Sequence, residues 1–408
     1  MLLATVAAVP PPPTPLGPFS DSAVAWTTWI TLMGFVGLTA LALFAAGPAA
    51  RRVDSDALAP VTVRLARAAV VLGVLVVPAV LTDLAHGASK SVGYDYAAAW
   101  NSLYDGSGAG LLSGLEVTLA LAGAAVVAPL TFRAPAGSRA RSWLLGVGLA
   151  AGAVSLGMTK FPAKAPDDWG RTAFETLIWM VHLLGGAAWI GGLAGLLLLA
   201  LSGAAPKAAQ GAFWSAVIRR FSALAMSCVA AIMLSGLFLY WEHVDGPKQL
   251  FTTMYGQVLG VKILIFGTML LLGVFNQFWL HPRIDALRAG GDRTSLRTIL
   301  LRRFPALLAV ELLLGMTVLF VAPFLHGSAR NQAFQAEAAE HATSATVELP
   351  KIPAKEVSAS TWTWGTAETV AVIVVMIAGH RVSGRIARSR TASAAVTMSR
   401  EPDDLVGA

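Results

Sequence analysis

The chain has 408 residues, of which 56% are hydrophobic and only 13% charged. An average soluble domain carries about 25% charged residues, so a soluble fold of this length could not bury so much apolar surface. The formal net charge of +7 does not indicate a nucleic-acid partner, because the basic residues lie in short clusters between apolar stretches. The composition therefore predicts an integral membrane protein in contact with lipid.

Nine apolar stretches are long enough to cross a bilayer as helices, since a hydrocarbon core about 30 Å thick needs roughly 20 apolar residues per span. They lack the alternation of barrel strands, and a helix satisfies its own backbone hydrogen bonds in lipid. The predicted fold class is an all-α, polytopic transmembrane helix bundle. The expected spans cover residues 23–46, 62–85, 108–132, 141–159, 172–201, 217–241, 256–280, 303–325 and 362–380.

The segment before the first span, residues 1–22, is rich in proline and has no basic start, so we expect an extracytoplasmic tail rather than a cleaved signal peptide. The single cysteine, Cys228, lies inside an apolar run. One cysteine can form neither a disulfide nor a multi-thiolate metal site within the chain. Its expected role is packing.

The connections between spans differ in charge, and this difference predicts the orientation. Lys and Arg gather in the odd-numbered connections and after the last span, which should therefore be cytoplasmic. The multi-pass chain then has its N-terminus outside and its C-terminus in the cytoplasm. These basic residues are Arg51, Arg52, Arg64, Arg67, Arg133, Arg139, Arg141, Lys207, Arg219, Arg220, Arg283, Arg288, Arg293, Arg297, Arg302, Arg303, Arg381, Arg385, Arg388 and Arg390.

Spans one to four weakly resemble spans five to eight. Residues 110–116 match 256–262 in glycine spacing, and His86 and His243 each close the second helix of a half. Parallel repeats of this kind occur in transporters, whose substrate sites lie between the halves. We therefore predict an eight-helix core with a 4+4 repeat plus one extra helix. Its parts are residues 23–160, 172–326, an outward loop at 327–361, the ninth span at 362–380 and a cytoplasmic basic tail at 381–408.

Ionisable residues inside the spans are informative, because a charge in lipid costs at least about 2.5–3.5 kcal/mol on insertion scales. Glu116 and Lys262 occupy equivalent positions in the two halves. They form either a structural ion pair between packed helices or part of a polar translocation path. Glu311 lies near the middle of the eighth span and Glu175 near the outer start of the fifth, as further polar candidates.

His182 lies about ten residues into the fifth span, beside the glycine pairs 185–186 and 191–192. Such glycines allow a neighbouring helix to approach closely and to bring further ligands within reach. The imidazole is either a hydrogen-bonded packing group or a site for a metal ion or proton.

Further candidate metal ligands are histidines expected on the outer side and methionines at helix depth. Imidazole suits Cu(II) and thioethers favour Cu(I), although methionine also fills helix contacts and interfacial histidines are often only solvated. No close pair such as His-x-x-x-His marks a site. The residues alone thus reach an outward-facing metal or proton site, whose candidate ligands are His86, His182, His243, His326, His341, Met158, Met180, Met254 and Met316.

Three stretches of the sequence resemble the copper-resistance D (CopD) family, the membrane domain also found in YcnJ-type copper transport proteins. The first is the histidine helix at 182–193, with Trp189 before a glycine pair. The second runs from Arg220 to Asn276, and the third is the basic entry at 301–303 into the span with Glu311. Together they cover roughly residues 172–326.

The resemblance implies an eight-helix core in the bacterial cytoplasmic membrane that takes up copper from the outer side, together with a separate extracytoplasmic copper chaperone. His182, Lys262 and Glu311 fall on the family's pattern. The chain differs from that pattern in its ninth span and in Gln277, where related sequences often have Arg.

The expected function is that of a copper-homeostasis membrane protein, with copper as substrate and no enzymatic activity. ATP hydrolysis is not expected, because the sequence has no Gly-rich phosphate loop ending in Lys-Ser/Thr. Two alternatives stay open: a b-type cytochrome with haem held by histidines from different helices, and an assembly factor that delivers copper to a cuproenzyme.

Overall fold

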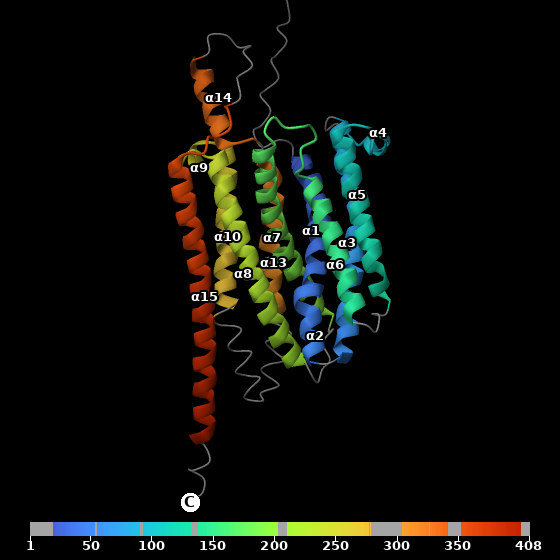
Figure 1. Cartoon of the computed structure of the whole chain (residues 1–408), viewed down its shortest axis with the longest axis vertical. Helices are drawn as coiled ribbons and strands as arrows, with labels where there is room; N and C mark the ends of the chain where they lie inside the picture. The colour runs from blue at the N-terminus through green and yellow to red at the C-terminus, as the bar shows by residue number, and fades with distance from the viewer. Residues whose placement is uncertain are drawn as a thin grey trace, which may run out of the picture.

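The computed structural model describes residues 19–53, 55–89, 93–132, 138–202, 210–276, 278, 304–325, 327–341 and 352–400. Within these ranges it contains helices and no strands, and nine helices are long and apolar enough to cross a membrane. The predicted all-α membrane bundle is therefore confirmed (Figure 1).

The elements are α1 (Phe19–Leu41), η1 (Ala42–Ala46), α2 (Gly47–Val53), α3 (Ser55–Ala88), α4 (Tyr96–Ser102), α5 (Gly108–Val127), η2 (Ala128–Thr131), α6 (Ser138–Met158), α7 (Trp169–Leu201), α8 (Gln210–His243), α9 (Gln249–Thr252), α10 (Met254–Phe275), α13 (Phe304–Val321), η5 (Ala322–Phe324), α14 (Ala329–His341) and α15 (Ala359–Arg400). Each of the nine predicted spans corresponds to one long helix or to a helix with its short extension.

The first helix is the centre of the bundle. It packs on α3, α6, α7 and α13, and its side chains Leu32, Phe35 and Leu41 are fully buried. A π-helical turn, η1, joins α1 to α2. Because α1 contacts helices of both predicted halves, it forms much of the boundary between them.

Helices α1 and α7 approach closely through glycines. A Cβ atom on Gly37 would lie 2.1 Å from the carbonyl oxygen of Ala187 and 2.6 Å from the Cα of Gly191. A Cβ atom on Gly191 would lie 2.7 Å from the Cα of Gly37. Lipid gives helices no hydrophobic reason to associate, so small residues that allow backbone contact stabilise such pairs. Of the glycine pair at 191–192, expected to permit close neighbours, Gly191 meets α1 in this way and Gly192 lies against the ring of Phe221 on α8.

Local structure at the start of α5 and α10 agrees with the predicted repeat. Each helix follows a short helix, α4 or α9. Each is capped by a hydroxyl that accepts the amide hydrogen of a glycine three residues later, Ser107 from Gly110 and Thr253 from Gly256, both at 3.0 Å. The helix contacts are also equivalent in the two predicted halves. Helix α1 contacts α3 and α6, and α7 contacts the corresponding helices α8 and α13. The repeat itself stays a prediction.

One expectation about the C-terminal region needs correction. The outward connection expected as a loop at 327–361 contains helix α14, which begins where the Ser328 hydroxyl accepts the amide hydrogen of Asn331. Its alanines, glutamines and glutamates are strong helix formers. The ninth span predicted at 362–380 agrees with the apolar part of α15, Ala359–Gly379, and the helix itself continues to Arg400. Figure 1 shows α15 along one edge of the bundle, extending past the other helices.

The two ends of the bundle differ in charge. We call them the α14 end, which also carries α4 and α9, and the α2 end (Figure 1). Arginines of the first, third and fifth connections lie at the α2 end, where Arg67 donates to the carbonyl oxygen of Thr131 at 2.8 Å and Arg220 donates to that of Phe44 at 3.5 Å. The predicted orientation places the α14 end outside.

Cysteine labelling tests this orientation. We expect Ala336→Cys, on the exposed surface of α14, to react with a membrane-impermeant maleimide in intact cells. Arg139→Cys, at the exposed start of α6, should react only after the membrane is opened. The native Cys228 is buried and should give little background. Labelling of Arg139→Cys but not Ala336→Cys in intact cells would reverse the orientation.

Candidate functional site

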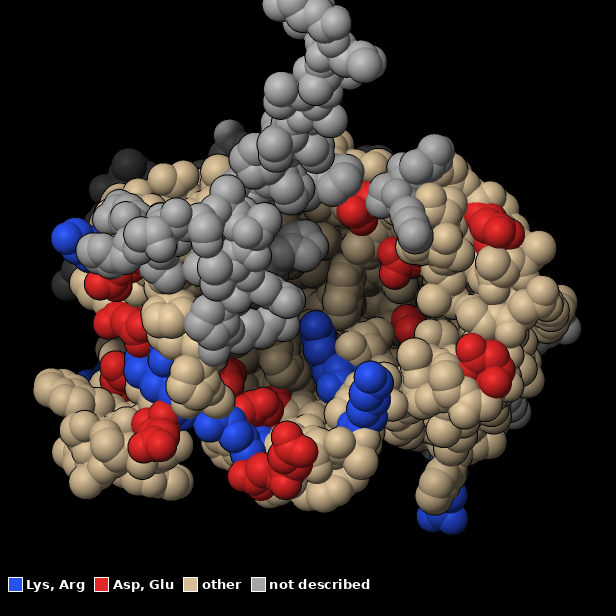
Figure 2. All heavy atoms as spheres, turned by 90° about the horizontal axis from the view of Figure 1, so that it is seen from above, with Lys and Arg blue, Asp and Glu red and all other residues tan. Residues whose placement is uncertain are grey.

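Polar and charged side chains gather within the membrane-spanning bundle toward its α14 end. Figure 2 views this end directly and shows a hollow near the centre of the face. Acidic atoms lie along one side of the hollow, and basic atoms lie across from them with further acidic atoms beside them. The polar residues toward this end come from several helices and are described in turn.

His182 on α7 is held by a serine from the neighbouring helix. Its Nδ1 lies 3.0 Å from the hydroxyl oxygen of Ser235 on α8. Ser235 donates its single hydroxyl hydrogen to its own helix, at 2.5 Å from the carbonyl oxygen of Ala231. The serine oxygen therefore accepts from Nδ1–H, which leaves Nε2 with the lone pair that a metal ligand needs.

Two lysines lie near His182. The ammonium group of Lys160, just after α6, is 4.4 Å from the ring centre of Trp179 and 5.6 Å from that of Trp29. Burial lowers the pKa of Lys160, because removal from water disfavours the charged form. Lys262 on α10 interacts electrostatically with both His182 and Lys160. These residues form the basic side of the candidate site.

A second group, from α1, α3 and α5, is acidic. The Nε2 atom of the buried His86 lies 2.6 Å from a carboxylate oxygen of Asp21. Asp83, one turn before His86, interacts electrostatically with Asp21, His86 and Glu116. Glu116 is only 9% exposed, and its Oε1 has no hydrogen-bond partner among the residues that the structure describes. We call these four residues the acidic group.

The structure does not pair Glu116 with Lys262. Each lies eight residues after the start of its helix, as the predicted repeat requires. However, no ion pair joins them within the described part of the chain, where every ion pair of a glutamate or lysine involves other residues. Lys262 interacts electrostatically with Lys160 and His182, and Glu116 interacts with Asp83. The place of Glu116 and Lys262 on a polar translocation path stays a prediction.

Glu311 lies apart from these groups. It is buried on α13 and accepts a hydrogen bond from the side-chain amide of Asn276, at the end of α10. Asn276 follows the last residue of α10, so this contact lies on the α2 side of Lys262. Glu311 thus lies closer to the α2 end than Lys262 does.

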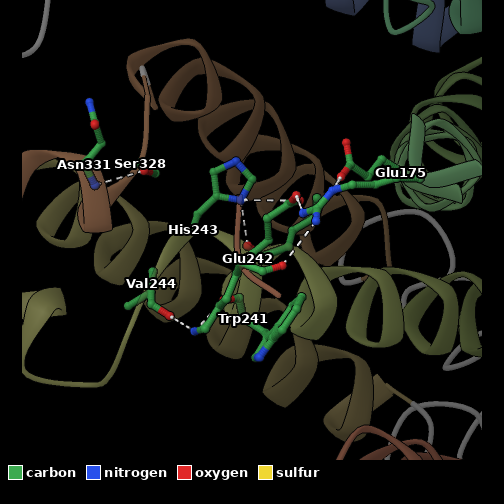
Figure 3. A network of polar contacts seen from close by, with 10 residues as sticks. Glu175, Trp241, Glu242, His243, Val244, Ser328 and Asn331 are labelled. Atoms are coloured by element: carbon green, nitrogen blue, oxygen red, sulfur yellow. Dashed lines mark hydrogen bonds and ion pairs between the residues drawn. The ribbon is translucent and has the colours of Figure 1, made fainter. Parts of the chain in front are cut away.

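Glu175 and His243 belong to a network at the rim of the α14 end (Figure 3). Arg171 donates to Glu175 at 2.6 Å and to Glu242 at 3.2 Å. His243 donates from Nδ1 to the carbonyl oxygen of Leu239 at 2.8 Å and stacks on Tyr255. These contacts connect α7 with α8 and α10, so the structure gives both residues a role in packing.

The same network fixes the segment before α15. Lys355 donates to the carbonyl oxygen of Trp241 at 3.0 Å and pairs with Asp245 at 3.1 Å, and the ring of Trp241 lies beneath its ammonium group. Arg171 donates to the carbonyl oxygen of Lys355 at 3.2 Å. One lysine thus contacts the C-terminal end of α8 in three ways.

We expect Lys355→Met to loosen the segment 352–358. The substitution removes the ion pair with Asp245 and the side-chain hydrogen bonds to the carbonyl oxygens of Trp241 and Val244. Cleavage there by proteinase K should become several-fold faster in purified protein, since proteolysis follows the population of the locally opened state. Glu356→Gln is the matched control, as Glu356 is exposed in the same segment. Equal cleavage rates for the wild type and Lys355→Met would contradict this role.

The remaining predicted ligands do not form a metal site in the described residues, where no group of three or more His, Cys, Asp or Glu side chains is placed to hold an ion. Met180 packs against Gly157 of α6, next to Met158. Met254 is the first residue of α10. His326 lies outside the described residues. The expected ring of outer histidines above methionines therefore stays a prediction.

Sequence reasoning missed several residues of the site. Asp83 could have been found, because it is an acid within the predicted second span, three residues before His86. Lys160 and Asp21 lie just outside the predicted spans, so only the packing of α6 and α1 shows their position. Ser235 carries no sequence signal, since serine is common in membrane helices.

Comparison with known proteins connects part of this chain to copper. Residues 215–325 match the family model described as copper resistance protein D. The copper transport protein CutJ of Bacillus subtilis (strain 168) is 38% identical over 96 residues. This match covers 24% of the present chain and 17% of CutJ, so the chain spans well under two thirds of that relative. No solved structure matches the chain.

The matched residues include most of α8, all of α10 and α13, and with them Ser235, Lys262 and Glu311. His182 lies before the matched segment, on α7. The resemblance seen in the sequence is thereby confirmed for the helices that follow α7. Over residues 215–325 this membrane protein is similar to the copper resistance protein D family.

Proposed function

We propose that this protein moves copper ions across the cytoplasmic membrane, entering from the α14 end, without ATP hydrolysis. The observation that carries the proposal is the family match over residues 215–325, because these helices supply Ser235, Lys262 and Glu311. The relative with a described role is a copper transport protein. A separate extracytoplasmic copper chaperone is a proposed partner.

The geometry supports this function through His182. Its Nε2 carries a lone pair within the bundle, and neutral imidazole nitrogen is a good ligand for copper. Asp21, Asp83 and Glu116 supply carboxyl oxygens toward the α14 end, where a cation would enter. Glu311, deeper in the bundle, supplies a further oxygen ligand on the way to the α2 end.

Uptake by proteoliposomes tests the proposal. Vesicles that contain the purified full chain should accumulate copper faster than empty vesicles without added nucleotide. Vesicles containing Glu311→Gln should accumulate it more slowly, because an amide is a weaker ligand and carries no charge. Exposed Glu337, on α14, supplies the matched control Glu337→Gln.

Two results would contradict the proposal. A Soret band of stoichiometric intensity in the purified protein would identify a haem protein instead. Unchanged total copper in cells lacking the protein, together with loss of a cuproenzyme activity, would identify an assembly factor.

A further inference from the structure

The basic side of the site contains two cations that no acid neutralises. Within the part of the chain that the structure describes, neither Lys160 nor Lys262 forms an ion pair. Lys160 lies instead between the rings of Trp29 and Trp179. A ring face attracts a cation but cancels none of its charge. In the described residues each amino group is therefore left without an acidic partner and can meet an anionic ligand.

Other basic groups at the same end of the bundle form ion pairs with acidic residues. Arg171 is paired with two glutamates, and Arg330 and Lys355 share Asp245. The acids needed for pairing are thus present at this end, and the fold does not bring them to Lys160 or Lys262. Uncompensated cations within a membrane bundle are costly and mark ligand sites.

Trp179 connects Lys160 with His182: the Lys160 ammonium group is 4.4 Å from the centre of the Trp179 ring, and the centres of the Trp179 and His182 rings are 6.2 Å apart. Lys262 interacts electrostatically with both Lys160 and His182. The field of the two lysines repels a bare copper ion at close range. The lone pair of Nε2 on His182, in contrast, attracts a metal. A negatively charged metal complex fits both the lysines and His182. Its metal can contact Nε2 of His182, while the groups already bound to the metal carry the negative charge.

Ammonium groups bind carboxylates through charge-assisted hydrogen bonds. We propose that the Lys160–Lys262–His182 site binds copper as an anionic carboxylate complex rather than as a bare ion, with Nε2 of His182 contacting the metal and the lysines contacting the carboxylates. This inference rests on the proposed copper function and names the chemical class of its substrate.

Binding to the full chain in nanodiscs of neutral phosphatidylcholine tests the inference, with Cu(II) citrate, citrate alone and hydrated Cu(II) as probes. We expect Cu(II) citrate to bind most tightly. Lys160→Met and Lys262→Met should each weaken its binding roughly tenfold, because each removes one nearby positive charge. Lys262→Arg should retain most of the affinity. Lys164→Met, at an exposed lysine four residues from Lys160, is the matched control and should bind within about twofold of wild type.

A second measurement needs no variant and so does not depend on their folding. Excess sodium sulfate should displace Cu(II) citrate from the wild-type protein and leave any binding of hydrated Cu(II) unchanged. Failure of sulfate to displace the complex would overturn the inference.

The other outcomes separate this inference from the proposed function. Tighter binding of hydrated Cu(II) than of the citrate complex, unaffected by loss of either lysine, would overturn the inference and leave copper transport intact. Citrate that binds equally well with and without copper would also overturn it, as an anion site unrelated to copper. Absence of binding for every copper probe, together with absence of uptake, would remove the proposed function itself.

Discussion

Replacing His182 with alanine is expected to abolish copper uptake while leaving the protein in the membrane. The substitution removes the Nε2 lone pair, which the contact of Nδ1 with Ser235 leaves available for a metal. Loss of a residue that merely supports a ligand costs about 10–100-fold in metal affinity or activity. Loss of the ligand itself should exceed roughly 100-fold, so uptake by proteoliposomes should fall to that of empty vesicles.

Two further variants make this result specific. Ser235→Ala keeps the imidazole but frees its Nδ1, and we expect uptake to fall about tenfold because the ring loses its fixed orientation. His243→Ala should retain most uptake, since His243 donates to its own helix and stacks on Tyr255 at the rim. Wild-type uptake by His182→Ala, or equal losses for His182→Ala and His243→Ala, would remove His182 from the mechanism.

The second large effect is expected at the contact between α1 and α7. Gly37→Ala adds a methyl group that would lie 2.1 Å from a backbone carbonyl oxygen, so the two helices must separate. Overpacking of a well-packed contact typically costs 1–3 kcal/mol, and a backbone that cannot move locally raises this to about 3 kcal/mol or more. Gly191→Ala meets the same backbone from the other side and should have a similar effect.

The measurement is the free energy of unfolding in mixed detergent micelles, with dispersity after solubilisation as a second readout. Gly146→Ala and Gly260→Ala are matched controls, because a Cβ at either position meets no atom within 4 Å. Alanine is a better helix former than glycine by about 1 kcal/mol, so these variants should be neutral or slightly more stable. If Gly37→Ala is as stable as Gly260→Ala, the close approach of α1 and α7 is not what holds the central helix.

The site was only partly predictable for a specific physical reason. Glu116 and Lys262 stand out in the sequence because charge in a membrane helix is rare and expensive. The partner of each such residue is not encoded nearby, since it comes from another helix. The described residues show no ion pair between Glu116 and Lys262, which was one of two alternatives, and the partner of Glu311 is Asn276, 35 positions away.

The amino-acid sequence by itself determined the number, position and helical nature of the nine spans. Each span must satisfy its backbone hydrogen bonds within itself, so its presence follows from local apolar length alone. The sequence also carried the resemblance to the copper resistance protein D family, whose model matches residues 215–325.

Only the tertiary structure decided which polar groups meet. It placed Lys160 between Trp29 and Trp179 and held His182 through Ser235. It also made α14 a helix within an expected loop and packed α1 against both halves. These features depend on side chains distant in the sequence and on the close approach of backbones at Gly37 and Gly191. Helix packing within lipid rests on such shape matching, which the apolar pattern of one span does not contain.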